Sequence, residues 1–185
     1  AISMQSIREI YKIGYGPSSS HTIAPGRAAT TFSSKNPDAK KFKVTLYGSL
    51  AATGVGHHTD KAILKELMPK EVQFVWKPDV FLEEHSNGME IKAYDKNDQE
   101  LDSWRVFSVG GGDLMDDKGL LNDKEIYPHH LLSEIMEWCR AEGKTFWEYV
   151  EDHEGPEIWS YLSEIWEVMK DTVRRGIDNE GVLPG

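Results

Sequence analysis

The 185-residue sequence contains a single cysteine, Cys139. One cysteine excludes a disulfide framework, a cysteine-based zinc site and an iron–sulfur cluster carried by this chain alone. It also makes a reducing cytoplasm the expected compartment. Apolar runs are only a few residues long, so we expect no transmembrane helix and no membrane partner. No basic segment followed by an apolar one opens the sequence, which predicts no signal peptide.

Positive charge is scarce in the last third of the sequence. Residues 1–114 hold 14 basic and 14 acidic side chains, whereas residues 115–185 hold 7 basic and 17 acidic ones and so carry the whole net charge of −10. An acidic surface repels phosphate groups, which argues against nucleic acid and anionic membranes as partners. The unequal charge predicts two regions built on different plans: a first domain over 1–114, and an acidic helical extension with a linker over 115–185.

The first region has the patterning of a mixed α and β domain. Helical spacing of apolar residues predicts a helix over 4–14, and Pro25 suits the first turn of a short helix over 26–32. A further helix is expected from Thr59 or Asp60 to Leu67. Alternating apolar and polar residues predict four strands, over 42–47, 71–76, 89–94 and 101–109. The expected fold class is therefore α+β, a mixed sheet of about four strands backed by helices and followed by a helical C-terminal extension.

The second region begins with a polar stretch over 113–124 and is then helical. Apolar residues at helical spacing predict a helix that breaks at Gly143. The Thr145–Glu148 spacing is that of a capping box and predicts a new helix. Regular apolar spacing then predicts a long amphipathic helix from residue 158 to about residue 177.

The densest polar cluster is residues 16–22, with the sequence Gly-Pro-Ser-Ser-Ser-His-Thr. Its tight turn places hydroxyls, backbone N–H groups and an imidazole at the expected start of a helix, a position that binds carboxylate or phosphate. The candidate residues are Ser18, Ser19, Ser20, His21 and Thr22. A polar loop with a helix cap is the alternative. A serine nucleophile activated by His21 is a further alternative, but no Gly-x-Ser-x-Gly elbow supports it.

A second cluster comprises residues 48–50, with the sequence Gly-Ser-Leu, and residues 54–60, with the sequence Gly-Val-Gly-His-His-Thr-Asp. Its two histidines lie between glycines and the expected start of a helix, where the helix dipole favours a neutral imidazole that can act as a base. His57 is the candidate base, and the alternative is a glycine-rich turn with solvated histidines. Adjacent histidines rarely coordinate one ion and no i, i+4 pair is present, so no metal site is expected in this chain.

Two further clusters flank predicted strands. The residues of the first are His85, Ser86, Asn87 and Gly88. The second is residues 108–113, with the sequence Ser-Val-Gly-Gly-Gly-Asp, and its candidate site residues are Gly110, Gly111 and Gly112. Asn-Gly is first of all a turn signal. Three glycines after a strand can cradle an anion, although the lysine and the spacing of a P-loop are lacking.

Together and in this order, the four clusters resemble the β domain or β subunit of the iron–sulfur-dependent L-serine dehydratases, also called L-serine ammonia-lyases. The matching segments are residues 13–22, 46–50, 54–60, 85–89 and 108–112. Each segment is weak alone, but the ordered set is specific. One departure is His58, which stands where the family often has glycine. Residues 174–185 resemble the junction that leads into the family's catalytic α domain, and the ends of the chain, Ala-Ile and Leu-Pro-Gly, suggest a trimmed piece.

The resemblance implies that L-serine becomes pyruvate and ammonia on a 4Fe-4S cluster, without pyridoxal phosphate. The cluster would be bound by the α portion, so this chain alone is expected to bind no cofactor and to be inactive. The resemblance also implies that the β domain closes over the cluster and supplies polar groups. His57 would remove the Cα proton, with His21 as its partner or as a substrate anchor. The serines at 18–20, Thr22 and the backbone of Gly110–Gly112 would hold the substrate carboxylate.

A function from another class is a regulatory small-molecule-binding module without a catalytic residue. The family's β domain resembles the allosteric substrate-binding domain of some 3-phosphoglycerate dehydrogenases, which responds to anionic ligands. On this alternative, residues 85–88 belong to an effector or interdomain site. A third alternative, a hydrolase using Ser20 and His21, lacks an identifiable acid partner. The partners that the resemblance implies are L-serine, the α domain or subunit, and a second copy in a homodimer.

Overall fold

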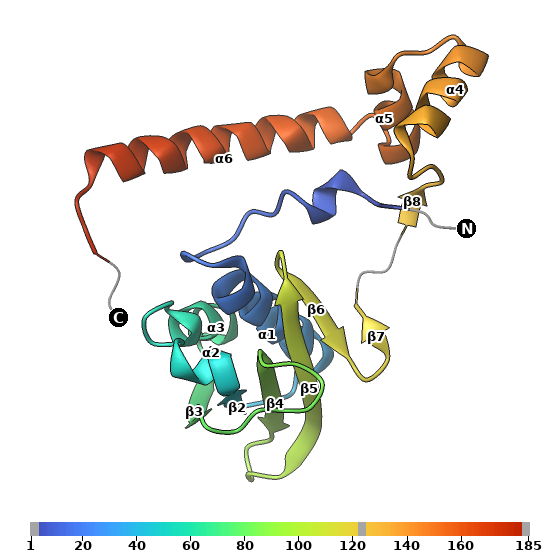
Figure 1. Ribbon diagram of the computed structural model, residues 1–185. Helices are drawn as coiled ribbons and strands as arrows, with labels where there is room; N and C mark the ends of the chain where they lie inside the picture. The colour runs from blue at the N-terminus through green and yellow to red at the C-terminus, as the bar shows by residue number, and fades with distance from the viewer. Residues whose placement is uncertain (1–3, 122–124, 183–185) are drawn as a thin grey trace. The chain divides into compact units, whose positions relative to one another are not determined.

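The computed structural model describes residues 4–121 and 125–182, which fall into two compact units (Figure 1). One unit comprises Gly14–Asn122 with Val182–Gly185, and the other comprises Ala1–Ile13 with Asp123–Gly181. Among the described residues, no helix combines the length and the apolarity that crossing a bilayer needs.

The first unit is built on a sheet of six strands. These are β2 (Lys41–Tyr47), β3 (Glu71–Lys77), β4 (Gly88–Tyr94), β5 (Glu100–Gly110), β6 (Asp113–Asp116) and β7 (Gly119–Leu120). Their order is β3-β2-β4-β5-β6-β7, with β2 and β3 parallel and the other neighbours antiparallel. A parallel pair needs a crossover connection, and α2 (Gly48–Ala52) and α3 (Thr59–Leu67) supply it.

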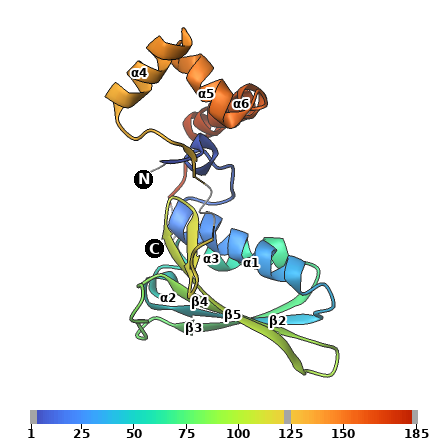
Figure 2. The ribbon, with the colours of Figure 1, turned by 90° about the vertical axis from the view of Figure 1, so that its right-hand side faces the viewer.

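Helices cover one face of this sheet (Figure 2). The longest of them is α1 (Ala24–Lys35), which follows directly on a short π-helical turn, η2 (Ser19–Ile23). Ala24, Ala28 and Ala29 of α1 are fully buried. Side chains this small allow the backbone of α1 to lie close to the sheet, so the helix and the turn before it are held at a defined distance from the strands.

The core lies between α1 and the sheet. Phe42, Val44 and Leu46 alternate along β2 and are fully buried, because every second side chain of a strand faces the same side. Phe32 of α1 packs against this layer, with its ring centroid 6.2 Å from that of Phe42 and 6.3 Å from that of Trp104 on β5. These contacts join α1 to both β2 and β5.

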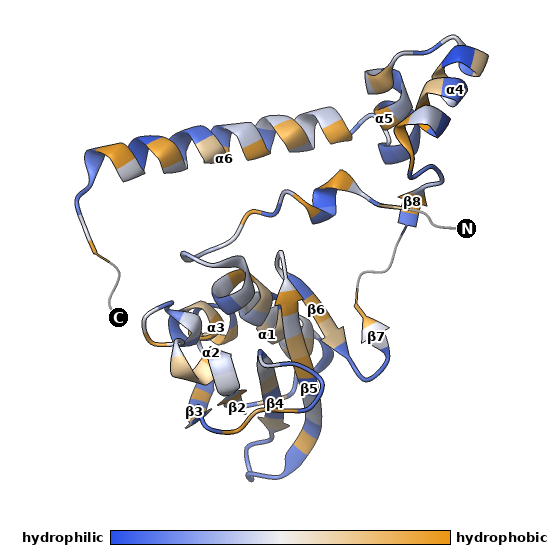
Figure 3. Cartoon of the chain, in the orientation of Figure 1, coloured by the Kyte–Doolittle hydropathy of each residue, from blue (hydrophilic) through white to orange (hydrophobic). Residues whose placement is uncertain are grey.

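The second unit is mainly helical. β1 (Met4–Gln5) pairs antiparallel with β8 (Glu125–Tyr127), and the 3-10 turn η1 (Ile7–Glu9) follows β1. The helices are α4 (Leu132–Glu142), α5 (Phe146–Glu154) and α6 (Ile158–Asp178). Apolar and polar residues recur along α6 in the amphipathic pattern that the sequence predicts (Figure 3).

The carboxylate of Glu154 ties the N-terminal segment to the helices of this unit. It accepts hydrogen bonds from the Ser6 hydroxyl at 2.6 Å, the Ile7 backbone N–H at 2.8 Å and the Tyr127 hydroxyl at 2.6 Å. Burial, and then the bond to Glu154, raises the pKa of Tyr127. Hydrogen bonds to an ionised carboxylate are stronger than neutral ones, so Glu154 is an effective anchor for this segment.

The structure confirms the α+β class and most of the predicted elements. The four predicted strands correspond to β2, β3, β4 and β5, and the helices expected over 26–32, from residue 59 or 60 to 67 and over 158–177 correspond to α1, α3 and α6. The capping box is also confirmed, because the Glu148 carboxylate accepts a hydrogen bond from the Thr145 backbone N–H at 2.8 Å.

The structure differs from the sequence prediction in several elements, since the helix α2 and the paired strands β1 and β8 were not predicted. The helix predicted over 4–14 is wrong, because Ser6 caps the short η1 turn and the Ile7 N–H donates to Glu154 instead of extending a helix. The polar stretch over 113–124 contains β6 and β7, which raise the number of strands from the expected four to six. Residues 122–124 of that stretch lie outside the described residues.

Truncating the buried ring of Phe32, which is 1% exposed, tests the core between α1 and the sheet. We expect Phe32→Ala to lower the free energy of unfolding by about 3–5 kcal/mol, because it leaves a cavity that the neighbouring side chains cannot fill. Urea denaturation followed by circular dichroism measures this loss. The control, Phe81→Ala, removes the same ring from a side chain that is 65% exposed and should change the stability by less than about 0.5 kcal/mol. Equal losses in the two variants would contradict the assignment of the core.

Candidate active site

The first candidate motif forms the π turn η2 and the residue before it. Ser18 caps this turn, since its hydroxyl accepts a hydrogen bond from the His21 backbone N–H at 3.3 Å. Thr22 is buried, and its hydroxyl donates to the Ser18 carbonyl. The half-buried imidazole of His21 has its Nδ1 atom 2.8 Å from the Ser20 hydroxyl, while Ser19 is exposed. The cluster of hydroxyls is therefore a compact turn that holds one histidine.

The second motif forms the loop between α2 and α3. The backbone N–H and the ring Nδ1 of His57 both lie 3.0 Å from the Thr53 carbonyl oxygen. A carbonyl oxygen only accepts, so a neutral His57 carries its proton on Nδ1 and its lone pair on Nε2. Gly54 permits the close path of this loop, because a Cβ there would lie 2.3 Å from the Leu50 carbonyl oxygen and 2.5 Å from the Trp76 ring. The loop thus fixes the tautomer of His57.

The structure brings His21 and His57 together. Their ring centroids are 4.8 Å apart, and the Nε2 atom of His21 lies 3.3 Å from the Ser49 hydroxyl. Burial has the largest effect on His21 and lowers its pKa; repulsion from His57 lowers it further, and a hydrogen bond to Ser49 opposes both. His21 is therefore kept neutral at a pH where an unperturbed histidine begins to take up a proton.

Two serines that hold this pair were not among the predicted site residues. Ser49 is the second residue of α2, which directly follows β2, and Ser108 of β5 donates its hydroxyl to the Ser20 carbonyl at 2.6 Å. The position of Ser49 after a predicted strand was an available signal, because sites form at the carboxyl ends of strands in open α/β sheets. Ser108 lies in the last of the four sequence clusters, but nothing local assigned it a role, because its partner Ser20 is 88 positions away in the sequence.

The third motif, residues 85–88, connects the elements that carry the histidine pair. The Ser86 carbonyl accepts a hydrogen bond from the Ser49 N–H at 3.1 Å, and the Asn87 carbonyl accepts one from the Ser108 N–H at 3.0 Å. Within the motif, Nδ1 of His85 accepts a hydrogen bond from the Asn87 N–H at 3.0 Å. The Oδ1 atom of Asn87 is buried and has no hydrogen-bond partner among the described residues. The motif is thus a turn that links β5 to α2, and the Oδ1 atom of Asn87 is its one buried side-chain atom that lacks a described hydrogen-bond partner.

The fourth motif, the glycine loop of residues 110–112, is anchored to α1. Its φ angles are +108° at Gly110, +61° at Gly111 and +81° at Gly112, values that favour glycine. The Arg27 guanidinium of α1 donates to the Gly112 carbonyl at 2.6 Å. A Cβ at either of the first two glycines would meet no atom within 4 Å, so this backbone borders open space. The loop is therefore anchored through Gly112, and space is open beside Gly110 and Gly111.

Potential cofactor ligands are few in the part of the chain that the structure describes. There, no group of three or more His, Cys, Asp or Glu side chains lies close enough to hold a metal ion. Cys139, the one cysteine of the sequence, is half-buried on α4. The described partners of the His21 ring are the hydroxyls of Ser20 and Ser49, so the carboxylate of a hydrolase triad is not among them.

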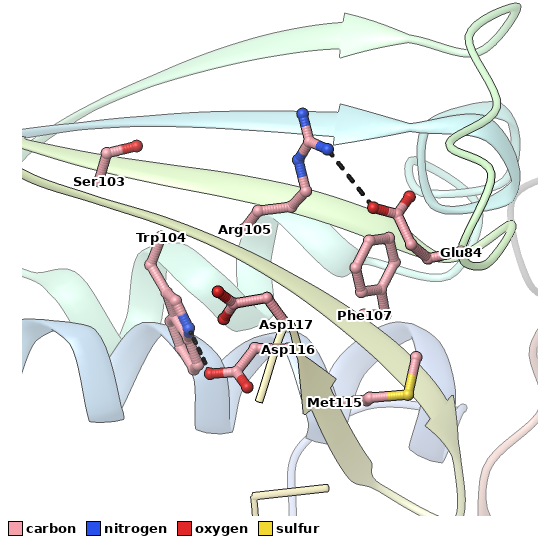
Figure 4. A pocket seen from close by; sticks show the side chains of 8 residues that line it. All are labelled: Glu84, Ser103, Trp104, Arg105, Phe107, Met115, Asp116 and Asp117. Atoms are coloured by element: carbon pink, nitrogen blue, oxygen red, sulfur yellow. Dashed lines mark hydrogen bonds and ion pairs between the residues drawn. The ribbon is translucent and has the colours of Figure 1, made fainter. Parts of the chain in front are cut away.

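A further hollow of about 360 Å³ lies at β5 and β6, and neither histidine of the pair lines it (Figure 4). It is lined by Glu84, Ser103, Trp104, Arg105, Phe107, Met115, Asp116 and Asp117. The Arg105 guanidinium lies 3.6 Å from the Glu84 carboxylate, and the Trp104 indole N–H donates to Asp116 at 3.1 Å. Three carboxylates against one guanidinium make this hollow better suited to a cationic ligand than to an anionic one.

Comparison with known proteins identifies relatives of the chain. The family model described as "Serine dehydratase beta chain" matches residues 6–75 and 68–119. The chain is 32% identical to the L-serine dehydratase of Streptomyces coelicolor, over 97% of the chain and 51% of that protein. It is also 32% identical to the L-serine dehydratase TdcG of Escherichia coli, over 98% of the chain and 51% of that protein. The chain spans about half the length of the curated relatives it matches.

The lowered pKa of His21 predicts a measurable coupling between the two imidazoles. In an NMR titration of this chain, we expect the His21 ring to titrate below the pH at which a histidine in a short Ser-His-Thr peptide titrates. His57→Gln removes the neighbouring charge and should raise the pKa of His21 only in part, because burial is the larger cause.

The same shift predicts the direction of a pH effect on stability. Because the folded state resists protonation of His21, the unfolded chain takes up the proton first as the pH falls below about 6.5, the usual histidine value. The contribution of His21 to stability is therefore complete above that pH and declines as the pH falls toward the lowered pKa. A His21 titration at or above the peptide's pH would refute the burial and the pairing.

Proposed function

This chain belongs to the serine dehydratase beta chain family, and we propose that it supplies the base and the substrate-holding groups of an enzyme that converts L-serine to pyruvate and ammonia. The observation that carries the proposal is the pair of imidazoles, His21 and His57, 4.8 Å apart on two loops held by hydrogen bonds. The relatives named L-serine dehydratase support the substrate.

The proposed base is Nε2 of His57. Its lone pair is available because Nδ1 is engaged with the Thr53 carbonyl, and the ring is only half-buried, so a substrate can approach it. The Cα proton of serine is a weak acid, and its removal needs a base held in a fixed orientation. The double contact of His57 with Thr53, through the backbone N–H and the ring, supplies that orientation.

His21 is proposed as the partner of the base and as an anchor for the substrate. A neutral His21 adds no positive charge next to His57, so it does not hinder His57 from accepting a proton. Its two ring nitrogens face the hydroxyls of Ser20 and Ser49, which can rotate to donate or to accept. The two hydroxyls can therefore reorient when a proton moves between the ring nitrogens of His21, and the ring itself stays in place.

The substrate carboxylate is proposed to lie between the serine turn and the glycine loop. Ser19 is exposed there, and the backbone of Gly110 and Gly111 borders open space. Ser18 and Thr22 shape the turn through the hydrogen bond between them and so act on the substrate indirectly. Ser108 lies two residues before the glycine loop and bonds to the turn, which keeps the two carboxylate-binding parts together.

The chemistry that these residues serve is an α,β-elimination. His57 takes the Cα proton and the Cβ–O bond breaks. The departing hydroxyl takes up one proton and leaves as water, which balances the proton that His57 removed. The aminoacrylate that remains tautomerises to an imine, and addition of water to the imine gives pyruvate and ammonia. The overall change is L-serine to pyruvate plus ammonia, with no net oxidation.

The 4Fe-4S cluster that the resemblance implies does not fit the residues of this chain. Such clusters are held by several cysteine thiolates, and the sequence has one cysteine, on a helix of the other unit. The cluster and its ligands are therefore proposed to belong to the α portion, within the half of the relatives' length that this chain does not span. The proposed part of this chain in the reaction is to bind the substrate and to remove its Cα proton through His57.

A regulatory role is a second candidate, favoured by the further hollow at β5 and β6. That hollow could hold a small molecule without involving either histidine. Its negative lining does not suit the anionic effector that the resemblance to the regulatory domain implies. Removal of the proposed base distinguishes the two roles, since a purely regulatory chain keeps turnover without it.

His57→Ala in the complete enzyme, with this chain joined to its α portion, tests the base. We expect kcat to fall by roughly 10²–10⁴-fold, because general-base catalysis contributes about that much. Pyruvate formation measures it. His58→Gly removes the neighbouring imidazole at a left-handed position where glycine is unstrained, and should leave turnover close to normal. Near-normal turnover of His57→Ala would refute the base assignment and favour the regulatory role.

The isolated 185-residue chain is expected to form no pyruvate from L-serine. It carries the proposed base but cannot hold the cluster that assists loss of the hydroxyl in the family it resembles. A coupled assay with lactate dehydrogenase measures pyruvate, and the purified chain should match a blank without protein. The complete enzyme under anaerobic conditions is the positive control. Turnover by the chain alone would show that the elimination needs no α portion.

A further inference from the structure

The turn that carries His21 is wound more loosely than an α-helix. In η2 the Ser18 carbonyl accepts the Thr22 N–H at 2.9 Å, four residues on, and the Ile23 N–H at 3.3 Å, five residues on. The Ala24 N–H then donates to the Ser19 carbonyl, five residues back, so the turn passes into the π register. Continuing this π-type register, the Ser20 carbonyl would receive the N–H of residue 25. That residue is Pro25, which has no N–H to donate.

Ser108 supplies a donor for this carbonyl from another strand. Its hydroxyl donates to the Ser20 carbonyl at 2.6 Å, and its side chain is buried, with 1% exposed. A carbonyl that is partly removed from water and loses its donor destabilises the fold. The Ser108 hydroxyl therefore supplies the hydrogen-bond donor for the Ser20 carbonyl that Pro25 lacks.

The register of the turn decides where the His21 ring points. If the Ala24 N–H moved from the Ser19 carbonyl to the Ser20 carbonyl, the turn would tighten to the α-helical pattern and the residues of η2 would rotate about its axis. The Ser18 cap, the contact of His21 with Ser49 and the 4.8 Å approach to His57 all belong to the observed register.

We propose that Ser108 is a positioning residue: its hydrogen bond to the Ser20 carbonyl holds η2 in the π register and thereby holds His21 against His57. The same strand continues into the glycine loop two residues later, so Ser108 also sets that loop relative to the histidine pair. The claim that Ser108 positions His21 does not depend on the proposed function. The claim that Ser108 affects turnover rests on the proposed function.

NMR of the 185-residue chain tests the positioning of His21 through the two histidine rings. In Ser108→Ala we expect the nuclear Overhauser contacts between the His21 and His57 rings to weaken and the His21 titration to move toward that of the reference peptide. Ser108→Thr keeps the hydroxyl and should retain both signals. Ser103→Ala, which removes an exposed hydroxyl from the same strand, is the matched control. Unchanged ring contacts and titration in folded Ser108→Ala would overturn the proposal.

A second variant covers the case in which Ser108→Ala does not fold. Pro25→Ala gives residue 25 the N–H that Ser20 lacks, so Ser108→Ala in that background should fold and should keep the His21–His57 contacts. Pro25→Ala alone should resemble the natural chain. If the double variant loses the ring contacts as fully as the single Ser108→Ala, or fails to fold as it does, the missing donor is not the reason for Ser108 and the proposal falls.

Turnover of the complete enzyme separates this proposal from the proposed function. Ser108→Ala should lower kcat by roughly 10- to 100-fold with a smaller change in KM, since misplacement of a reacting group by about 1 Å has effects of this size. If His57→Ala keeps its turnover while the NMR contacts respond to Ser108, the base assignment fails and the positioning role stands. If His57→Ala loses turnover and Ser108→Ala changes neither kcat nor the ring contacts, the positioning role fails.

Discussion

The close packing of α1 on the sheet is the constraint on which the candidate site depends. Ala24, Ala28 and Ala29 present only methyl groups, so the backbone of α1 can lie close to the strands. The same helix continues backward into η2 with His21, and its Arg27 holds the carbonyl at the end of the glycine loop. If α1 lay a few ångströms farther from the sheet, His21 would move away from α2 and the glycine loop would lose its contact with Arg27. The packing of the core therefore also positions the site.

Much of this fold followed from local patterns, and the exceptions have a common cause. The strand over 41–47 alternates because its inner residues Phe42, Val44 and Leu46 enter the core, a pattern that is visible in the sequence. The segment 4–14 also has helical spacing, but the Ile7 N–H bonds to Glu154, 147 positions away. The local sequence gives no sign of such a distant partner, and tertiary contacts of this kind override helix propensity.

The candidate site also combines motifs that are visible in the sequence with contacts that only the fold creates. Glycines and polar residues marked His21 and His57 as members of constrained loops, but their convergence depends on how α2 and α1 lie on one face of the sheet. Ser49 and Ser108 lie within the sequence motifs, but no role was predicted for either, because only their partners, the His21 ring and the Ser20 carbonyl, show what they do. Side-chain type indicates chemistry, whereas the fold decides which groups meet.

His58 shows how a backbone constraint next to a proposed base explains a departure in sequence. Its φ is +59°, in the left-handed region, which glycine enters freely and other residues enter at a cost of about 1–2 kcal/mol. Glycine, which the family often has here, is therefore the unstrained choice. The surrounding backbone holds His58 in place, because its carbonyl accepts the Ala62 N–H at 3.0 Å and the next residue, Thr59, donates to the Gly54 carbonyl at 2.8 Å. These bonds start α3 and close the loop behind His57, so the strain at His58 is balanced by the contacts that orient the base.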